Sequence, residues 1–303
     1  MGKNIILLSD GTGNSAAAIW RTNVWRLFKA LDLSGPDQIA FYDDGVGTSA
    51  FKPLALLGGA FGFGLKRNVL HLYEFLCRNY EDGDRIFCFG FSRGAFTIRV
   101  VTALVTTQGL IPAGDKSDAA LRHEAQSLYR QLRMDRSFQI THSLIWALRL
   151  LRHPFEATKA LFRRRPQKVQ TAPPSIRFLG LWDTVAAYGL PVYEMTRAID
   201  LYFWPISMRD RDLSQRVERA CHALALDDER TTFHPLLWNE LNEVNERNEP
   251  RVFSGSKSPN IAYIDQERVS QVWFAGMHAN VGGGYPDDAM AYIPLDWIAS
   301  EAE

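Results

Sequence analysis

A serine lies between two glycines in the pentapeptide GFSRG, which spans Gly90 to Gly94. An apolar run, Arg85–Phe91, leads into it, and the helical pattern AFTIRVVTAL follows. A G-x-S-x-G sequence between a strand and a helix is typical of a nucleophile elbow, whose sharp turn holds the serine hydroxyl outward. Glycine is needed on both sides because the strand and the helix pass too closely for side chains. The pattern therefore predicts Ser92 as a nucleophile, with Gly90 and Gly94 as supports of the turn.

A serine hydroxyl is a poor nucleophile until a base removes its proton, and the base needs an acid that fixes its tautomer. Behind such an elbow, the acid and then the histidine follow at the ends of later strands. The run Ile176–Trp182 leads to Asp183, and His278 comes two residues after the run Gln271–Gly276. The alternatives are a helix cap at Asp183 and a structural role for His278. We predict a triad of Ser92, Asp183 and His278 that acts through an acyl-enzyme.

The first apolar run of the chain ends in the turn SDGTGN, and three chemistries begin with such a turn. Gly11, Gly13 and Ala16 satisfy the dinucleotide-binding fingerprint. The Asp-Gly-Thr sequence is similar to that of dehalogenase-type phosphotransferases, but these need an aspartate two residues before Asp10, where this chain has Leu8. The N–H groups of a turn between strand and helix can also form half of an oxyanion hole.

An elbow serine needs two backbone donors for the oxyanion that develops during acyl transfer. One is the N–H of the residue after the nucleophile, here Arg93, and the other comes from a loop after a neighbouring strand. We predict that Gly11 and Thr12 provide the second donor. Asp10 is then an organiser of the turn and not a nucleophile.

Two further acids, Asp43 and Asp44, stand at the end of the second apolar run, in the segment YDDGVGT. They could bind the ribose of a dinucleotide, belong to a glycine turn, or form a weak metal site with Asp10. The triad chemistry needs none of these, so we expect neither a metal nor another cofactor.

Five apolar runs, rich in β-branched or aromatic residues, predict the strands that position these residues. Each run is nearly continuous, as in strands of a parallel sheet that is covered on both faces. Helical patterns separate the first three runs. We therefore predict a single domain over residues 1–303, with an α/β-hydrolase-like, mostly parallel sheet and helices on both faces. The predicted strands are Asn4–Ser9, Ile39–Asp43, Arg85–Phe91, Ile176–Trp182 and Gln271–Gly276, and the predicted helices are Thr22–Leu31, Lys66–Tyr80 and Ala95–Gln108.

Two long stretches show no strand pattern. Residues 115–174 are predicted to form a helical cap over the ligand end of the sheet, and residues 191–250 a second insertion of helix and loop. Within the cap, residues 149–168 hold seven basic residues against one acid, Glu156, with apolar residues between them. This segment is either an amphipathic cap helix with a solvated basic face or a contact with an anionic membrane surface.

The composition excludes several functional classes. Lys plus Arg and Asp plus Glu each number 34, so no overall field attracts nucleic acid. Three separated cysteines without a C-x-x-C motif argue against a disulfide framework and a thiolate zinc site. No apolar run approaches the roughly 20 residues of a spanning helix, and the short segment before the first strand leads us to expect no Sec-type signal. We expect a cytoplasmic protein, or one that a dedicated machine exports.

Eight segments, in order along nearly the whole chain, resemble the catalytic domain of type VI secretion phospholipase effectors, long catalogued as a domain of unknown function. They are SDGTGN, TNVWRL, YDDGVGT, GAFGFGLKRNV, YEDGDRIFCFGFSRGAF, FLGLWDTVAAYG, HALALDD and HANVGGGYP. The resemblance implies an α/β-hydrolase fold and carboxylic-ester cleavage, in some members phospholipase A activity on glycerophospholipids. It places the nucleophile, acid and base of the family on Ser92, Asp183 and His278. Many relatives carry an aromatic residue where this chain has Gly13.

The main hypothesis is a serine esterase or lipase whose substrate is an acyl ester or phospholipid. A membrane-surface binding module without turnover, based on residues 149–168, is the alternative from another functional class. A dinucleotide-dependent oxidoreductase accounts for Gly11, Gly13 and Ala16 but leaves the elbow and the histidine motif without a role.

Overall fold

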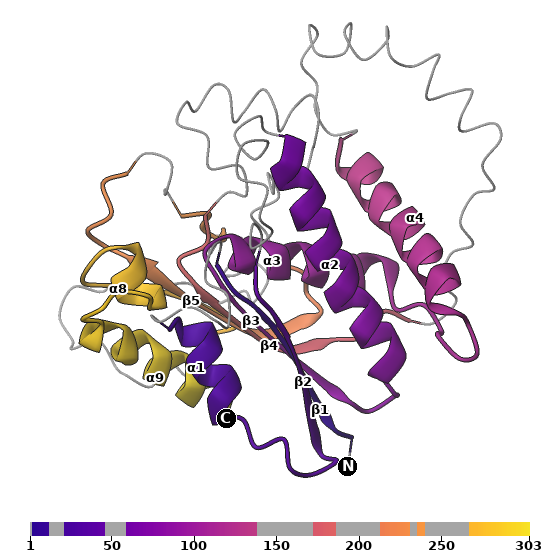
Figure 1. Cartoon of the computed structure of the whole chain (residues 1–303), viewed down its shortest axis with the longest axis horizontal. Coiled ribbons are helices and arrows are strands. Elements are labelled where there is room, and N and C mark those ends of the chain that lie inside the picture. Colours follow the sequence, from indigo (N-terminus) through magenta and orange to yellow (C-terminus); the bar gives the residue numbers. More distant parts are fainter. Residues whose placement is uncertain are drawn as a thin grey trace, which may run out of the picture.

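The computed structural model describes residues 2–11, 21–45, 59–137, 172–185, 213–230, 235–239 and 267–303, with the backbone alone for 59–63 and 133–137. These residues form a six-stranded sheet with the order β2-β1-β3-β4-β5-β6, in which all neighbours are parallel (Figure 1). The prediction of an α/β fold with a parallel sheet is confirmed. The strands are β1 (Asn4–Ser9), β2 (Gln38–Asp43), β3 (Arg85–Phe91), β4 (Ile176–Trp182), β5 (Val217–Ala225) and β6 (Val269–Phe274).

Helices cover both faces of this sheet (Figure 1). Successive side chains of β1 alternate between two cores: Leu7 packs with α2, α3 and α4, and Leu8 packs with α1, α8 and α9. Both leucines are fully buried, which explains why the strand reads as a continuous apolar run. The helices are α1 (Asn23–Ala30), α2 (Gly59–Asn79), α3 (Arg93–Gln108), α4 (Asp118–Ser137), α8 (His278–Gly282) and α9 (Tyr292–Ala302), and the 3-10 helix η4 spans Ala289–Ala291.

Residues 191–250 were expected to hold no strand, and this expectation is wrong between Val217 and Ala225. The strand β5, with the sequence VERACHALA, lies between β4 and β6, and its last six residues are all buried. It contains one β-branched residue and no aromatic residue, so its sequence gives a weak strand signal. Pairing on both sides and burial define the strand here, and both are properties of the tertiary structure.

The predicted cap, residues 115–174, is described only in part. Its first helix, α4, packs on α2 and α3 through Leu121, Ala125 and Leu128, and so belongs to the helical layer on one face of the sheet. The basic segment 149–168 lies outside the described residues, as do residues 186–212 and 240–266. None of the helices in the described part is both long and apolar enough to cross a bilayer.

Candidate active site

Three of the predicted site residues meet at the carboxyl edge of the sheet, where ligands bind in open α/β folds. Ser92 follows β3, Asp183 follows β4, and His278 comes after β6. The Nε2 atom of His278 lies 2.8 Å from the Ser92 Oγ, and its Nδ1 atom lies 2.5 Å from the Asp183 Oδ2. All three residues are buried. The structure thus forms a continuous hydrogen-bonded path from carboxylate to imidazole to hydroxyl.

The serine occupies a strained turn. Its φ of 58° and ψ of −123° lie in a region that residues with a side chain rarely adopt. A Cβ on Gly94 would lie 2.1 Å from the carbonyl oxygen of Ser9, and one on Gly90 would lie 2.7 Å from the backbone of α3. Both glycines are therefore required by close backbone contacts, which is the reason the sequence analysis gave for them.

The acid is held by the neighbouring strand. Asp183 is fully buried with a φ of 38°, and its N–H donates to the carbonyl of Ala223 in β5 at 2.7 Å. Its Oδ1 accepts from the Ala225 N–H at 3.1 Å, while Oδ2 meets the imidazole. These bonds fix the carboxylate in one orientation, so that its second oxygen faces His278.

A second histidine, His222 of β5, supports the residue that follows the acid. Its Nε2 accepts from the Thr184 N–H at 3.1 Å, so the ring is neutral with its proton on Nδ1. Complete burial lowers the pKa of His222 to about 3. This histidine lies in β5, the strand that the sequence did not predict.

Asp10 lies directly after β1 and accepts hydrogen bonds from three groups around this turn. This buried carboxylate accepts from the Gly11 N–H and from the hydroxyls of Thr22 and Tyr42, each at 2.6 Å. Burial raises the pKa of Asp10 to about 7.

The three residues predicted to donate to the oxyanion are Gly11, Thr12 and Arg93, and the structure describes two of them. The Gly11 N–H is already bonded to the Asp10 carboxylate, so the assignment of Gly11 as an oxyanion donor is wrong in this structure. Thr12 lies outside the described residues. Arg93 is the first residue of α3 and comes directly after Ser92. The first backbone N–H groups of a helix point out of its N-terminal end, which here lies beside Ser92.

The hypothesis of a metal at Asp10, Asp43 and Asp44 gains no support. Both oxygens of Asp10 accept the bonds described above, and the Oδ2 of Asp43 accepts from Ser9 and Asn68 at 3.1 and 2.6 Å. Within the described ranges, the group of three ligand-type side chains that lie close together is Asp183, Asp228 and His278, with atoms within 4.8 Å of one another. Two of these are the hydrogen-bonded acid and imidazole.

Asp228 and His222 were not among the predicted site residues, although the structure places both against the site. Asp228 follows β5 and contacts His278, and His222 lies within β5. The segment HALALDD, which contains both residues, was part of the family resemblance. An acid shortly after a strand is the signal that could have identified Asp228, but it required recognition of β5.

A protein-family model matches almost the entire chain. The model of the family described as "T6SS, Phospholipase effector Tle1-like, catalytic domain" matches residues 3–301. An uncharacterised protein of Saccharomyces cerevisiae is 27% identical over 267 residues, which cover 84% of this chain and 34% of the yeast protein.

Solved structures give more distant matches. An uncharacterised protein from Pseudomonas aeruginosa has 18% identity and a TM-score of 0.46, over 99% of this chain and 45% of that one. The Tle1 effector, in a structure with the VgrG spike of the type 6 secretion system, has 15% identity and a TM-score of 0.43, over 94% of this chain and 51% of that one. This chain therefore spans about a third of the yeast relative and about half of each solved chain.

Proposed function

Since this chain belongs to the family of Tle1-like type VI secretion phospholipase effectors, as their catalytic domain, we propose that it is a serine hydrolase that cleaves carboxylic esters of phospholipids. The observation that carries the proposal is the path of hydrogen bonds from Asp183 through His278 to Ser92 at the carboxyl edge of the sheet. The family match supports an ester hydrolase, and this geometry supports a serine mechanism.

In the proposed reaction, the Ser92 Oγ attacks the ester carbonyl carbon while Nε2 of His278 accepts the hydroxyl proton. The tetrahedral intermediate collapses, the alcohol leaves with the proton from the imidazole, and an acyl-serine remains. Water then attacks the acyl group as the imidazole accepts its proton, and the fatty acid departs when that proton returns to Ser92. Asp183 keeps the Nδ1 proton in place and stabilises the imidazolium formed in each half.

The negative charge of each tetrahedral intermediate needs two donors aimed at the oxyanion. We assign the first to the N–H of Arg93. The second is proposed to come from the turn after β1 beyond Gly11, with Thr12 as the first candidate, because the Gly11 N–H serves Asp10.

Covalent labelling tests the nucleophile. A fluorophosphonate probe should label the wild-type protein, and Ser92→Ala should lose both labelling and ester hydrolysis. Ser34→Ala, in an exposed loop, is the matched control and should behave as the wild type. Labelling of Ser92→Ala at the wild-type level would contradict the proposal.

The substrate class is tested by comparing p-nitrophenyl esters of increasing acyl length with phospholipid vesicles. Release of fatty acid from the vesicles, lost in Ser92→Ala, is the expected result. Vesicle flotation without turnover would instead favour a membrane-binding module. Delivery by a type VI secretion machine is a further proposal from family membership, and copurification with a VgrG spike protein tests it.

A further inference from the structure

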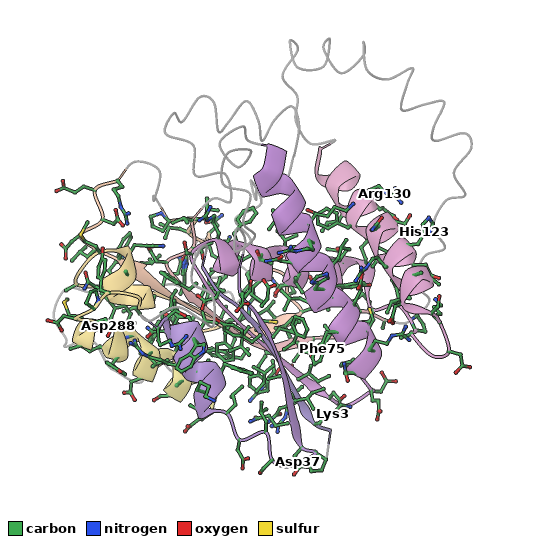
Figure 2. All side chains as sticks on the ribbon, in the orientation of Figure 1. Lys3, Asp37, Phe75, His123, Arg130 and Asp288 are labelled. Atoms are coloured by element: carbon green, nitrogen blue, oxygen red, sulfur yellow. The ribbon has the colours of Figure 1, made fainter. Side chains whose placement is uncertain are left out.

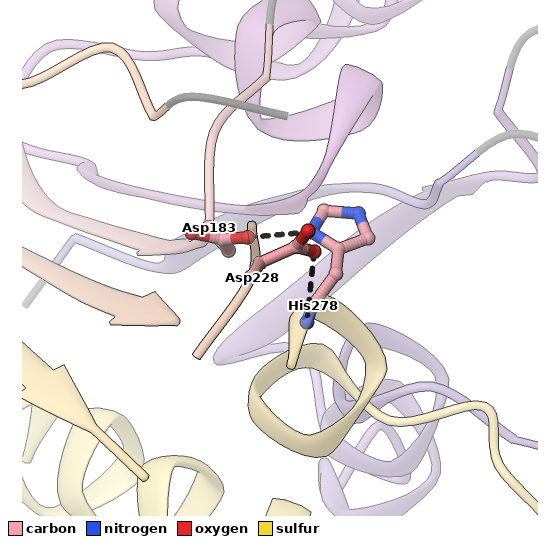
Figure 3. A group of neighbouring side chains, drawn as sticks. All are labelled: Asp183, Asp228 and His278. Carbon is pink, nitrogen blue, oxygen red and sulfur yellow. Dashed lines mark hydrogen bonds and ion pairs between the residues drawn. The ribbon is translucent and has the colours of Figure 1, made fainter. Parts of the chain in front are cut away.

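A second carboxylate approaches the histidine of the triad. Asp228 lies three residues beyond the end of β5, and its Oδ2 accepts from the backbone N–H of His278 at 3.3 Å. Figure 3 shows both carboxylates directed at His278, Asp183 at the ring and Asp228 at the backbone nitrogen. The side chain of Asp228 is only 3% exposed, so its charge is poorly screened by water.

This carboxylate has a built-in counterion. The guanidinium of Arg230 donates to the Asp228 Oδ2 at 2.5 Å and to its Oδ1 at 2.9 Å, and the Arg230 N–H donates to Oδ1 at 3.1 Å. These bonds, with that from the side chain of Arg230 the strongest, hold the pKa of Asp228 below its usual range. Asp228 is therefore ionised wherever an ester hydrolase with a histidine base would work.

The segment that carries Asp228 is fastened to the segment that carries His278. Leu226 donates its N–H to Phe274 at 3.0 Å, and Asp227 exchanges two bonds with Gly276, at 3.1 and 2.6 Å. The bond from His278 to Asp228 continues this series by one step. These bonds thus hold the start of α8, which carries the imidazole, in a fixed position relative to the end of β5.

We propose that Asp228 is a positioning residue for the general base, which fixes the backbone of His278 and, together with Arg230, sets the pH range in which the imidazole is an active base. The inference rests on the proposed serine-hydrolase function. It adds a second acid, from a different strand, to the acid that contacts the ring.

The charges of Asp228 and Arg230 affect protonation of the His278 imidazole in opposite directions. A carboxylate near an imidazole stabilises the protonated form, and a cation disfavours it. Removal of the charge on Asp228 takes one negative charge from beside His278, whereas removal of the charge on Arg230 takes one positive charge from the same neighbourhood. The two changes must shift the pH dependence in opposite directions. In the described part of the chain, the other ionisable groups on the segments around His278 include Asp183 after β4, Asp227 and Glu229 after β5, Arg93 at the start of α3, and Tyr285, Asp287 and Asp288 after α8.

The experiment is a pH profile of kcat/KM for hydrolysis of a p-nitrophenyl ester. Asp228→Asn keeps an oxygen that can accept from His278 but loses the charge, and its acidic limb should move to lower pH by roughly half to one unit. Arg230→Gln should move the same limb to higher pH. Asp228→Ala also loses the backbone contact and should lower kcat roughly tenfold, with a smaller change in KM.

Glu218→Gln is the matched control. Glu218 lies near the start of β5, at the end of the strand opposite to Asp228, and is likewise an acid paired with an arginine, Arg177, at 2.8 Å. Its pH profile should equal that of the wild type. Circular dichroism spectra and fluorophosphonate labelling should show that each variant is folded and has an intact Ser92.

The inference is overturned if Asp228→Asn and Arg230→Gln leave the limb in place, or move it in the same direction. That result is distinct from failure of the proposed function, which would appear as a wild-type protein without Ser92-dependent turnover. If Asp228→Asn proves unfolded, Arg230→Gln decides alone: a move of its acidic limb to higher pH supports the inference, and no move or a move to lower pH overturns it.

Discussion

Asp10 shows how one buried residue couples the turn near the active site to pH. Burial raises its pKa from 3.8 to about 7, against the three hydrogen bonds that favour the charged form. Between these two values the folded chain keeps a proton that the unfolded chain releases. Stability from this site is therefore present at acidic pH and is lost as the pH rises toward 7.

We predict that Asp10→Asn removes this loss. The free energy of unfolding of the variant, relative to wild type, should improve as the pH rises from about 4 to 7, by at most about 4 kcal/mol. Chemical denaturation at several pH values measures it, with the exposed Asp82→Asn as control. A difference that is constant with pH would contradict the ionisation described here. Ester hydrolysis should persist, since Asp10 organises the turn and performs no chemistry.

At the scale of elements, the sequence was informative where local signals and tertiary structure agree. β1, β3 and β4 have continuous apolar sequences because both of their faces are covered, and their predicted bounds equal the observed ones. β5 was missed because alanine, cysteine and histidine fill most of its buried positions. Ser92, Asp183 and His278 could be predicted as a triad because the chemistry restricts their types and order, and the structure brings the three side chains together. Asp228 and His222 could not be found without β5.

His222 provides a test of how β5 supports the acid. Its pKa is lowered from 6.5 to about 3 by burial, so below pH 6.5 the unfolded chain takes up a proton that the folded chain refuses. This site therefore makes the protein less stable as the pH falls from about 6.5 to 3.

We predict that His222→Gln is less acid-sensitive than wild type. The glutamine still offers an acceptor to the Thr184 N–H but has no group to protonate. Its free energy of unfolding at pH 7 should be lower by roughly 1–3 kcal/mol from imperfect bonding, and this deficit should shrink as the pH falls below 6.5. Urea denaturation between pH 4 and 7 measures the trend, with His123→Gln on α4 as control. Parallel curves would rule out the assigned role of His222.

At the scale of the molecule, the segment that carries His278 is locked to the beginning of the chain. Asn23 of α1 is fully buried, and its Nδ2 donates to the carbonyls of Val281 and Ala291 at 2.9 and 2.7 Å. Arg26 pairs with Asp288 at 2.5 Å, and Figure 2 shows Asp288 on the side that holds α8 and α9. These contacts join positions more than 250 residues apart in sequence.

We predict that Asn23→Ala lowers the free energy of unfolding by roughly 2–4 kcal/mol, because two buried carbonyls lose their donor. It should also lower kcat in protein that is still folded, since α8 begins at His278. Thermal denaturation and ester hydrolysis at low temperature separate the two effects. Asn79→Ala, which removes one bond to Phe75 near the end of α2, should have a much smaller effect on both. Equal losses of unfolding free energy and of kcat in the two variants would show that the contacts of Asn23 with Val281 and Ala291 have no special role.

The lock between α1 and the segment after β6 has a consequence for biosynthesis. A ribosome delivers Ser92 and Asp183 earlier, but His278 and the residues that seal α1 emerge only after residue 277. Non-local contacts of this kind form late in folding. A growing chain therefore carries Ser92 through most of its synthesis without His278, and the hydrogen-bonded path from Asp183 to Ser92 can close only after β6 has been added.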